Sequence, residues 1–309
     1  MTRSIRGVLP IAPTPFQDTG EIDYPGLERL VNWAYSQGID GLCTGMVSEL
    51  LRLTGSERIE LTHRLAEMNA GRGAMVASVG AESVNQAVVF ADEALRAGCD
   101  AIMAIPPVSL SLPDGELEHY YRCLADRIPL PLIVQDASGY VGRPISLDLC
   151  VRLLDAYGPD KILFKPEAAP TGPNVSTLRD RSHGRARIFE GSGGICLVDS
   201  YRRGICGSMP GMEAVDAVVA LWQALERGDE SATYRLYLPL CALVALQCQA
   251  GLDGFLAIEK YLLVRRGLLP SAHRRRPHTW ELDRETAAEV DRLWEHLRCA
   301  AAAVKQSEP

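Results

Sequence analysis

Lysine is the residue that this sequence most clearly lacks. Of its 32 basic residues only four are lysines, at positions 161, 165, 260 and 305, and arginine supplies the rest. Arginine keeps its charge under all ordinary conditions, whereas a desolvated lysine can lose its proton and attack a carbonyl carbon. Covalent chemistry on an amine therefore has very few candidate positions in this chain.

The sequence also lacks the residue patterns that hold metals and nucleotide cofactors. Its nine cysteines are odd in number and scattered, and no C-x-x-C pair occurs, which argues against a zinc site or a disulfide framework. None of the six histidines is spaced as a ligand pair with another. No G-x-G-x-x-G follows the first predicted strand, so no dinucleotide-binding fold is indicated. We therefore expect no metal and no cofactor.

Long apolar segments and an excess of positive charge are absent as well. We find no run of about 18 apolar residues and no signal-peptide pattern at the N-terminus, so we expect no membrane role. Most cysteines sit in apolar runs and are predicted to be buried, reduced thiols, as in cytoplasmic proteins. The formal net charge is −7, which disfavours nucleic-acid binding. The one basic cluster, residues 273–278, is interpreted as a solvated loop between helices.

What the chain does contain is a regular alternation of short apolar runs with longer helical patterns. Eight such pairs favour a closed (β/α)8 TIM barrel of the α/β class over an open sheet. The predicted strands are 7–11, 39–43, 74–79, 100–105, 131–135, 162–165, 188–190 and 204–209. The predicted helices are 24–37, 56–69 with Ser56 as its N-cap, 83–96, 114–126, 146–156, 174–181, 195–203 and 214–227.

The chain changes character near residue 229. Helical patterns near 231–250, 253–267 and 283–304 follow one another without a strand pattern between them. We therefore predict that residues 1–228 form the (β/α)8 barrel as the catalytic domain. Residues 229–309 are predicted to form a small C-terminal helical domain.

In a barrel of this kind, functional side chains stand where strands end and the following loops begin. Lys165 ends the apolar strand 162–164, so its amine is a candidate nucleophile in the barrel mouth. Glu167 follows two residues later, and positions i and i+2 of an extended chain face the same side. Glu167 is then placed to move protons beside the amine. On these residues alone, a lysine that reaches solvent and a plain ion pair remain open interpretations.

Two glycine-containing loops are the next candidates. The loop after strand two includes Met46, Val47 and Ser48, and the loop after strand seven includes Gly191 and Ser192. Glycines allow backbone N–H groups to approach an oxyanion or a carboxylate. We expect these five residues to contribute to substrate binding. The loops 108–112 and 138–141 are expected to set the length and stereochemistry of the substrate.

Several short segments together resemble one enzyme superfamily. They are residues 7–16 (GVLPIAPTPF), the Ser48-Glu49 pair, 104–107 (AIPP), 163–165 (LFK) and the Glu190-Gly191 turn. Their order is similar to that in the dihydrodipicolinate synthase / N-acetylneuraminate lyase superfamily, and the resemblance covers nearly the whole chain. It implies a barrel with a C-terminal helical domain, a homotetramer, and a Schiff base between Lys165 and a small 2-oxo acid.

Three places depart from the superfamily pattern. Gln135 stands where these synthases and lyases carry the tyrosine that relays protons to the aldol oxygen, and it is expected to contact the substrate instead. Met46 and Val47 replace a pair of threonines, and Val108 replaces a second tyrosine. The segments 134–137 (VQDA) and 164–167 (FKPE) resemble instead the 2-keto-3-deoxy-L-arabonate dehydratase-like members of the superfamily.

These departures favour loss of water over cleavage of a carbon–carbon bond. Retro-aldol cleavage of a 2-oxo-3-deoxy sugar acid needs a base at the C4 hydroxyl, and Gln135 cannot accept a proton. Dehydration needs one carboxyl group that acts first as base and then as acid, which is the role predicted for Glu167. The predicted function is therefore a Schiff-base dehydratase. Two alternatives stay open: a pyruvate-releasing retro-aldolase, with water or Ser48 in place of the tyrosine, and a non-catalytic barrel that binds a 2-oxo acid.

Overall fold

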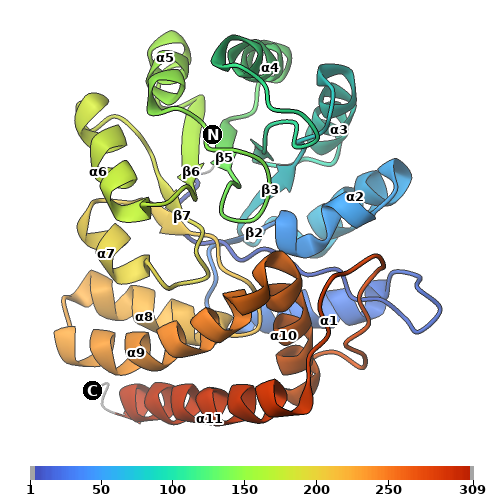
Figure 1. Cartoon of the computed structure of the whole chain (residues 1–309), viewed down its shortest axis with the longest axis vertical. Helices are drawn as coiled ribbons and strands as arrows, with labels where there is room; N and C mark the ends of the chain where they lie inside the picture. Colours follow the sequence, from blue (N-terminus) through green and yellow to red (C-terminus); the bar gives the residue numbers. More distant parts are fainter. Residues whose placement is uncertain (1–3, 307–309) are drawn as a thin grey trace.

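The computed structural model describes residues 4–306, and its centre is a closed ring of parallel strands (Figure 1). β1 (Gly7–Val8) pairs with β8 (Gly207–Ser208), which pairs with β7 (Phe189–Glu190). The remaining five strands pair in chain order: β2 (Gly41–Cys43), β3 (Ala74–Ser78), β4 (Ala101–Ala104), β5 (Leu132–Asp136) and β6 (Ile162–Pro166). Parallel bridges from Ile11 to Cys43 and from Phe164 to Ile188 close the ring. The predicted (β/α)8 barrel is therefore confirmed.

Helices that alternate with the strands cover the outside of the barrel (Figure 1). They are α1 (Tyr24–Ser36), α2 (Gly55–Asn69), α3 (Val84–Arg96), α4 (Asp114–Arg127), α5 (Leu147–Tyr157), α6 (Thr171–Arg181), α7 (Leu197–Arg202) and α8 (Val215–Arg227). Each turns an apolar stripe toward the strands. In α5, for example, Leu149, Leu153 and Leu154 are buried at helical spacing. The strands themselves are buried on both faces, as expected for a parallel sheet under helices.

The start of α2 differs from the prediction. The helix begins at Gly55 with Thr54 as its N-cap, and not with Ser56. The Thr54 side chain accepts from the backbone N–H of Glu57, and the Glu57 side chain accepts from the backbone N–H of Thr54. This capping box satisfies two orphan N–H groups at once, so it decides where the helix starts.

The first and last strands are shorter than predicted, and each has a local cause. Pro10 has no N–H, so the regular ladder of β1 ends before it. The chain nevertheless stays beside β8, because the N–H of Leu9 donates to Ser208 O at 2.9 Å and that of Ile11 to Pro210 O at 2.8 Å. The last strand, β8, begins later than predicted because Gly204 has a φ of 91° and belongs to the turn after α7.

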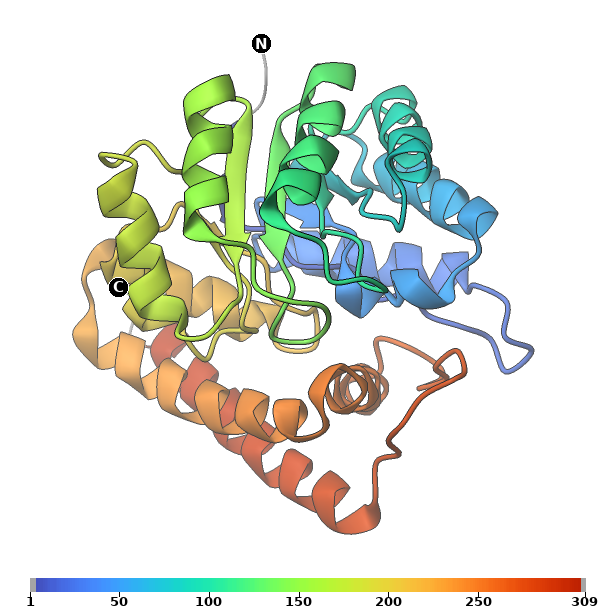
Figure 2. The same cartoon turned by 45° about the horizontal axis from the view of Figure 1, so that its top comes forward.

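Three helices follow the barrel: α9 (Glu230–Gln247), α10 (Gly251–Arg265) and α11 (Arg284–Gln306). Figure 2 shows them gathered on one side, with α10 beyond the end of the barrel to which β5 and β6 point. The boundary that we propose between the two domains falls between α8 and α9, and the outer ends of both domains lie outside the described residues.

One long helical segment of the C-terminal region is unusually apolar, although no membrane role is expected from the sequence. The 36 residues of Glu230–Arg265 are long and apolar enough to cross a membrane by length and composition alone. Half of the most apolar window is buried inside the structure, as in a core helix of a soluble protein. A 3-10 turn, Cys248–Ala250, separates α9 from α10 within this segment.

The basic segment 273–278 is a loop between helices, as predicted, but only part of it is solvated: Arg276 and Pro277 are exposed, whereas the two arginines before them are held by the protein. Arg274 is buried and donates to the carbonyls of Asp253 at 3.2 Å and Trp280 at 2.8 Å. Arg275 binds both carboxylate oxygens of Glu57, at 2.6 and 2.7 Å. These two guanidinium groups find fixed acceptors on α10 and α2, so the segment packs against the protein.

The cysteines are also less buried than predicted. All nine are free thiols, but only Cys43, Cys99 and Cys150 are buried. Five others are half-buried, and Cys299 is exposed on α11. Cys123, Cys241 and Cys299 lie in helices, where apolar neighbours in sequence do not bury a thiol that faces away from the core.

A buried ion pair fastens α10 to the loop that follows β2. Lys260 and Glu49 are both fully enclosed, and the ammonium of Lys260 donates to the Glu49 carboxylate and, at 2.9 Å, to His273 O. The other Glu49 oxygen accepts from the backbone N–H of Arg275 at 3.0 Å. The loop that carries Met46 and Val47 is therefore tied directly to the C-terminal helices.

We expect Lys260→Met to lower the free energy of unfolding by about 3–5 kcal/mol, because the buried Glu49 carboxylate would lose its directly bonded cation and keep only the Arg52 guanidinium, 3.8 Å away. Urea unfolding measures the change. Lys305→Met, at an exposed lysine on α11, is the matched control and should have little effect. The double variant Lys260→Met with Glu49→Gln should recover much of the loss. A loss below about 1 kcal/mol in Lys260→Met would show that Arg275 and its neighbours suffice to satisfy Glu49.

Candidate active site

Lys165, Glu167 and Gln135 form a hydrogen-bonded group inside the barrel mouth. Gln135 on β5 pairs in register with Lys165 on β6. The Lys165 ammonium lies 3.3 Å from Glu167 Oε1, and the Gln135 amide donates to Glu167 Oε2 at 2.7 Å. The backbone N–H of Glu167 donates to Asp136 O at 3.1 Å, so the extended pairing continues past Pro166. Positions 165 and 167 therefore share the inward face.

Burial sets the acidity of this carboxyl group. The side chains of Lys165 and Glu167 are each only 5% exposed. Burial raises the pKa of Glu167 above its usual value, and the nearby Glu190 carboxylate adds to the rise. The charge of Lys165 and the hydrogen bond from Gln135 act in the opposite direction without cancelling it. A carboxylate with a raised pKa is a stronger base than an ordinary one, and its protonated form is a usable acid near neutral pH.

Gln135 offers a further hydrogen-bonding atom. Its amide nitrogen is used by Glu167, but its carbonyl oxygen, Oε1, is buried and has no hydrogen-bond partner within residues 4–306. Buried polar atoms are normally paired. Because Gln135 lines the cavity beside Lys165, this oxygen is available to accept a hydrogen bond from a substrate hydroxyl.

The structure brings most of the predicted site residues to one cavity. Met46, Val47, Gln135, Lys165, Glu167 and Gly191 all line it. A Cβ at Gly191 would lie 2.4 Å from Lys165 Cε and 2.7 Å from Glu167 Oε1, so any larger residue there would push these two side chains from their positions. The free space between the side chains is about 20 Å³, room for about one water molecule. A ligand larger than water can enter only when some of the lining side chains move aside.

The two predicted serines lie outside this lining. Ser48 is fully buried, donates to Ala12 O at 2.5 Å and accepts from the N–H of Gly45 at 3.1 Å. Ser192 donates to the Glu190 carboxylate and accepts from the N–H of Cys196 at 2.9 Å. Both hydroxyls thus serve the shape of their own loops. The position of Ser48 therefore does not support the alternative in which its hydroxyl replaces the missing tyrosine.

Other lining residues were not singled out from the sequence. They include Tyr140 from the loop after β5, Gly193, Met209, Gly211, and Phe255 from α10. Tyr140 falls in the loop that was expected to shape specificity, and an aromatic residue in the segment Gly139-Tyr140-Val141-Gly142 could have been singled out from the sequence. Phe255 had none, because only the packing of α10 against the barrel brings it to the mouth.

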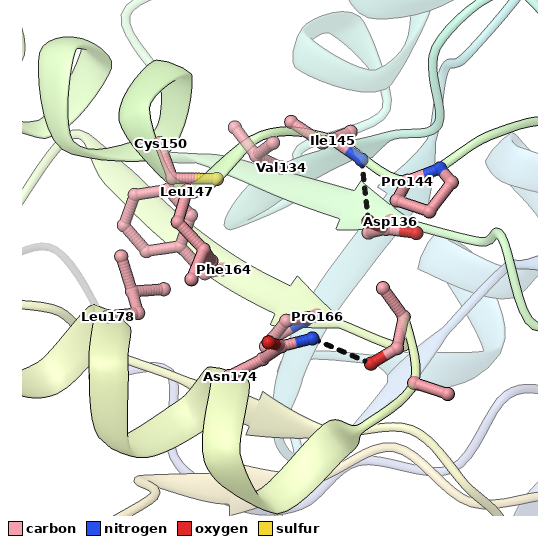
Figure 3. A pocket seen from close by; sticks show the side chains of 12 residues that line it. Val134, Asp136, Pro144, Ile145, Leu147, Cys150, Phe164, Pro166, Asn174 and Leu178 are labelled. Atoms are coloured by element: carbon pink, nitrogen blue, oxygen red, sulfur yellow. Dashed lines mark hydrogen bonds between the residues drawn. The ribbon is translucent and has the colours of Figure 1, made fainter.

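A larger cavity of about 180 Å³ lies on the opposite face of β5 and β6 (Figure 3). Its walls are the outward residues of the two strands together with α5 and α6, among them Val134, Phe164 and Leu178. Asp136 accepts from the N–H of Ile145 there at 2.7 Å. Because strand residues alternate between faces, this cavity is separated from Lys165 by the sheet itself and contains no amine.

The inner group has the parts for covalent catalysis on a ketone. The amine of Lys165 is a nucleophile once it loses its proton, Glu167 can take or give a proton beside it, and Gln135 can hold a hydroxyl. Among residues 4–306, no cluster of three or more His, Cys, Asp or Glu side chains could hold a metal ion.

Comparisons with known proteins find matches over most of the chain. The family model described as the dihydrodipicolinate synthetase family matches residues 4–296. An L-2-keto-3-deoxyarabonate dehydratase from Azospirillum brasilense is 28% identical over 294 residues, which cover 92% of each chain. A 4-hydroxy-tetrahydrodipicolinate synthase from Polynucleobacter asymbioticus is 30% identical over 192 residues, which cover 61% of this chain and 62% of that one. The crystal structure of a dihydrodipicolinate synthase from Rhodopseudomonas palustris superposes with a TM-score of 0.86 at 26% identity, covering 96% of this chain and 99% of that one.

Proposed function

This chain belongs to the dihydrodipicolinate synthetase family, whose members are lyases, and from that premise we propose that it dehydrates a 2-oxo-3-deoxy sugar acid through a Schiff base on Lys165. The observation that carries the proposal is the hydrogen bonding of Glu167 between the Lys165 amine and the Gln135 amide. The relative from Azospirillum brasilense, named L-2-keto-3-deoxyarabonate dehydratase, supports the same substrate class.

The reaction begins when the neutral amine of Lys165 attacks the C2 ketone. Loss of one water gives an iminium, which draws electrons from C3 and makes its hydrogens acidic. Glu167 removes one C3 proton, and the electron pair of that bond forms the enamine. The pair then expels the C4 hydroxyl, which leaves as water with a proton that comes ultimately from Glu167, so that Glu167 is ionised again. Hydrolysis of the remaining imine frees Lys165 and releases a 2-oxo acid lighter than the substrate by one water.

Glu167 suits dehydration better than cleavage because of where it stands. It lies beside the amine, and therefore beside C3 of a bound iminium, where the proton is removed. Retro-aldol cleavage instead takes a proton from the C4 hydroxyl. Gln135, on the neighbouring strand, can hold that hydroxyl but cannot accept its proton. The proton transfers that Glu167 and Gln135 can support beside Lys165 are therefore those of an elimination.

Product analysis tests the proposal. We expect 2-keto-3-deoxypentonate to be converted to the dehydrated 2-oxo acid, seen by mass spectrometry, without pyruvate in a lactate dehydrogenase assay. Pyruvate with glycolaldehyde in equal amounts would identify a retro-aldolase and contradict dehydration. If neither product forms with pentonates or hexonates of either C4 configuration, the barrel is a binding protein for 2-oxo acids, and dissociation constants by calorimetry would then describe it.

A further inference from the structure

Tyr140 is a side chain of the cavity for which the proposed reaction has given no role. It lies in the loop between β5 and α5, is half-buried, and lines the same cavity as Lys165, Glu167 and Gln135. The loop passes directly over the end of β6, since a Cβ at Gly139 would lie 3.3 Å from Glu167 O. The Tyr140 side chain and the Glu167 carboxyl group therefore line one cavity, with the loop of Tyr140 packed against the backbone of Glu167.

The loop is held by hydrogen bonds and does not hang free. The Asp136 carboxylate accepts from the N–H of Ser138 at 2.9 Å and from that of Ile145 at 2.7 Å, the second of which is drawn in Figure 3. The backbone N–H of Tyr140 donates to Ala137 O at 2.8 Å. The Asp136 side chain at the end of β5 thus binds backbone N–H groups at both ends of the loop, which restricts the positions available to the Tyr140 ring.

The environment of Tyr140 determines the protonation state of its phenol. Burial raises the pKa of Tyr140 well above its usual value, and the carboxylates of Glu167, Glu190 and Glu213 and the thiol of Cys248 raise it further. The phenolate is disfavoured by all of them, so Tyr140 stays protonated at neutral pH. A phenol in this state is no base for a substrate hydroxyl, and it gives up its proton only to a strongly basic oxygen, such as that of a departing hydroxide.

We propose that Tyr140 is a catalytic residue that protonates the departing C4 hydroxyl during dehydration, an inference that rests on the function proposed above. Glu167 takes the C3 proton as the enamine forms. The C4–O bond then breaks, its electron pair stays on the oxygen, and the Tyr140 proton turns the leaving group into water. Glu167 returns its proton to the phenolate. Both residues end as they began, and the substrate has lost one hydrogen from C3 and the hydroxyl from C4.

This assignment separates the two proton tasks that a single carboxyl group would otherwise perform. Glu167 works at C3, next to the iminium, while Tyr140 works at C4 from the loop above. The same protonated phenol is the wrong form for retro-aldol cleavage, which has to remove the C4 hydroxyl proton first. Tyr140 therefore determines the type of reaction as well as its rate.

The test compares two leaving groups on one carbon skeleton: 2-keto-3-deoxypentonate and its 4-deoxy-4-fluoro analogue. Fluoride leaves as an anion and needs no proton, whereas hydroxide needs one. We expect Tyr140→Phe to slow water loss on the order of 100-fold, while fluoride release, followed with an ion-selective electrode, changes little. Glu167→Gln should slow both reactions, because both begin at C3. Tyr157→Phe, at a tyrosine whose hydroxyl donates to Asp126 on the outer surface, is the matched control and should slow neither.

Equal slowing of both leaving groups in Tyr140→Phe would overturn the inference and leave Tyr140 as a wall of the cavity. Unchanged water loss in Tyr140→Phe would overturn it as well. The proposed function is judged separately, on the wild-type protein. Wild-type release of pyruvate, or of no product at all, removes the dehydratase and with it the role of Tyr140. Wild-type dehydration with a fully active Tyr140→Phe removes only the role of Tyr140.

Discussion

Replacing Lys165 with alanine should abolish both turnover and the covalent adduct that borohydride traps with a 2-oxo acid. Among the described residues that line the cavity, Lys165 is the one lysine, so no neighbouring amine can form the iminium in its place. We expect activity to fall to the background rate, a loss on the order of a millionfold if the effect resembles removal of the nucleophile from another covalent enzyme. The intact mass of the protein after incubation with substrate and borohydride measures the adduct directly.

Two further variants test whether the loss of activity comes from the missing nucleophile, and not from the missing charge or from the removal of any lysine. Lys165→Arg keeps a cation beside Glu167 but cannot form an imine, so it should be as inactive as alanine. Lys161 stands at the opposite end of the same strand, where its ammonium donates to Leu130 O at 2.7 Å. Lys161→Ala should therefore trap a full equivalent of substrate. An adduct that persists in Lys165→Ala would assign the Schiff base to another lysine and contradict the proposed mechanism.

Replacing Glu167 with glutamine should stop dehydration while imine formation continues. Glutamine keeps the size of the side chain and its hydrogen bonding to Gln135, but it cannot take the C3 proton. We expect a loss of roughly 10² to 10⁴-fold in kcat, the usual worth of a positioned general base. Borohydride should then trap the intact substrate on Lys165, whereas the wild-type protein yields a mixture that includes the dehydrated species. Normal turnover by this variant would exclude Glu167 as the base.

The same residue predicts the acidic limb of the pH profile. Glu167 has to be ionised to remove the C3 proton, so kcat should fall as pH falls through the pKa of that carboxyl group. Burial and Glu190 raise this pKa, which moves the limb above the range of an ordinary carboxyl group. A profile of kcat in the wild-type protein should show this limb, and the residual activity of Glu167→Gln should not. An identical limb in both proteins would assign the titration to another group.

Most of the fold could be predicted from the sequence because it depends on local periodicity. The alternation of apolar runs with helical patterns is visible in the chain itself, and the eight-fold repeat leaves few arrangements other than a barrel. The strand ends were less accurate. They depend on single residues such as Pro10, whose missing N–H interrupts a ladder, and on caps such as Thr54, which compete with near neighbours like Ser56.

Within the active site, the residues that could be predicted are those whose placement follows from the strand pattern of the sequence. Lys165 and Glu167 share a face because a strand alternates with a period of two, and that follows from their spacing alone. The position of Gln135 opposite Lys165 follows from parallel strands in chain order. Met46, Val47 and Gly191 could be expected near the mouth because they follow strands two and seven.

The rest was decided only by tertiary structure, because it depends on contacts between segments far apart in the chain. No local pattern shows that Ser48 turns its hydroxyl to Ala12 and away from the cavity, or that α10 brings Phe255 to the mouth. Nor does any show that Asp136 binds both ends of the loop from which Tyr140 reaches the cavity of Glu167. Periodicity determines which way a side chain faces within its own element. Which groups meet, and how each polar atom is satisfied, is settled by the packing of one element against another.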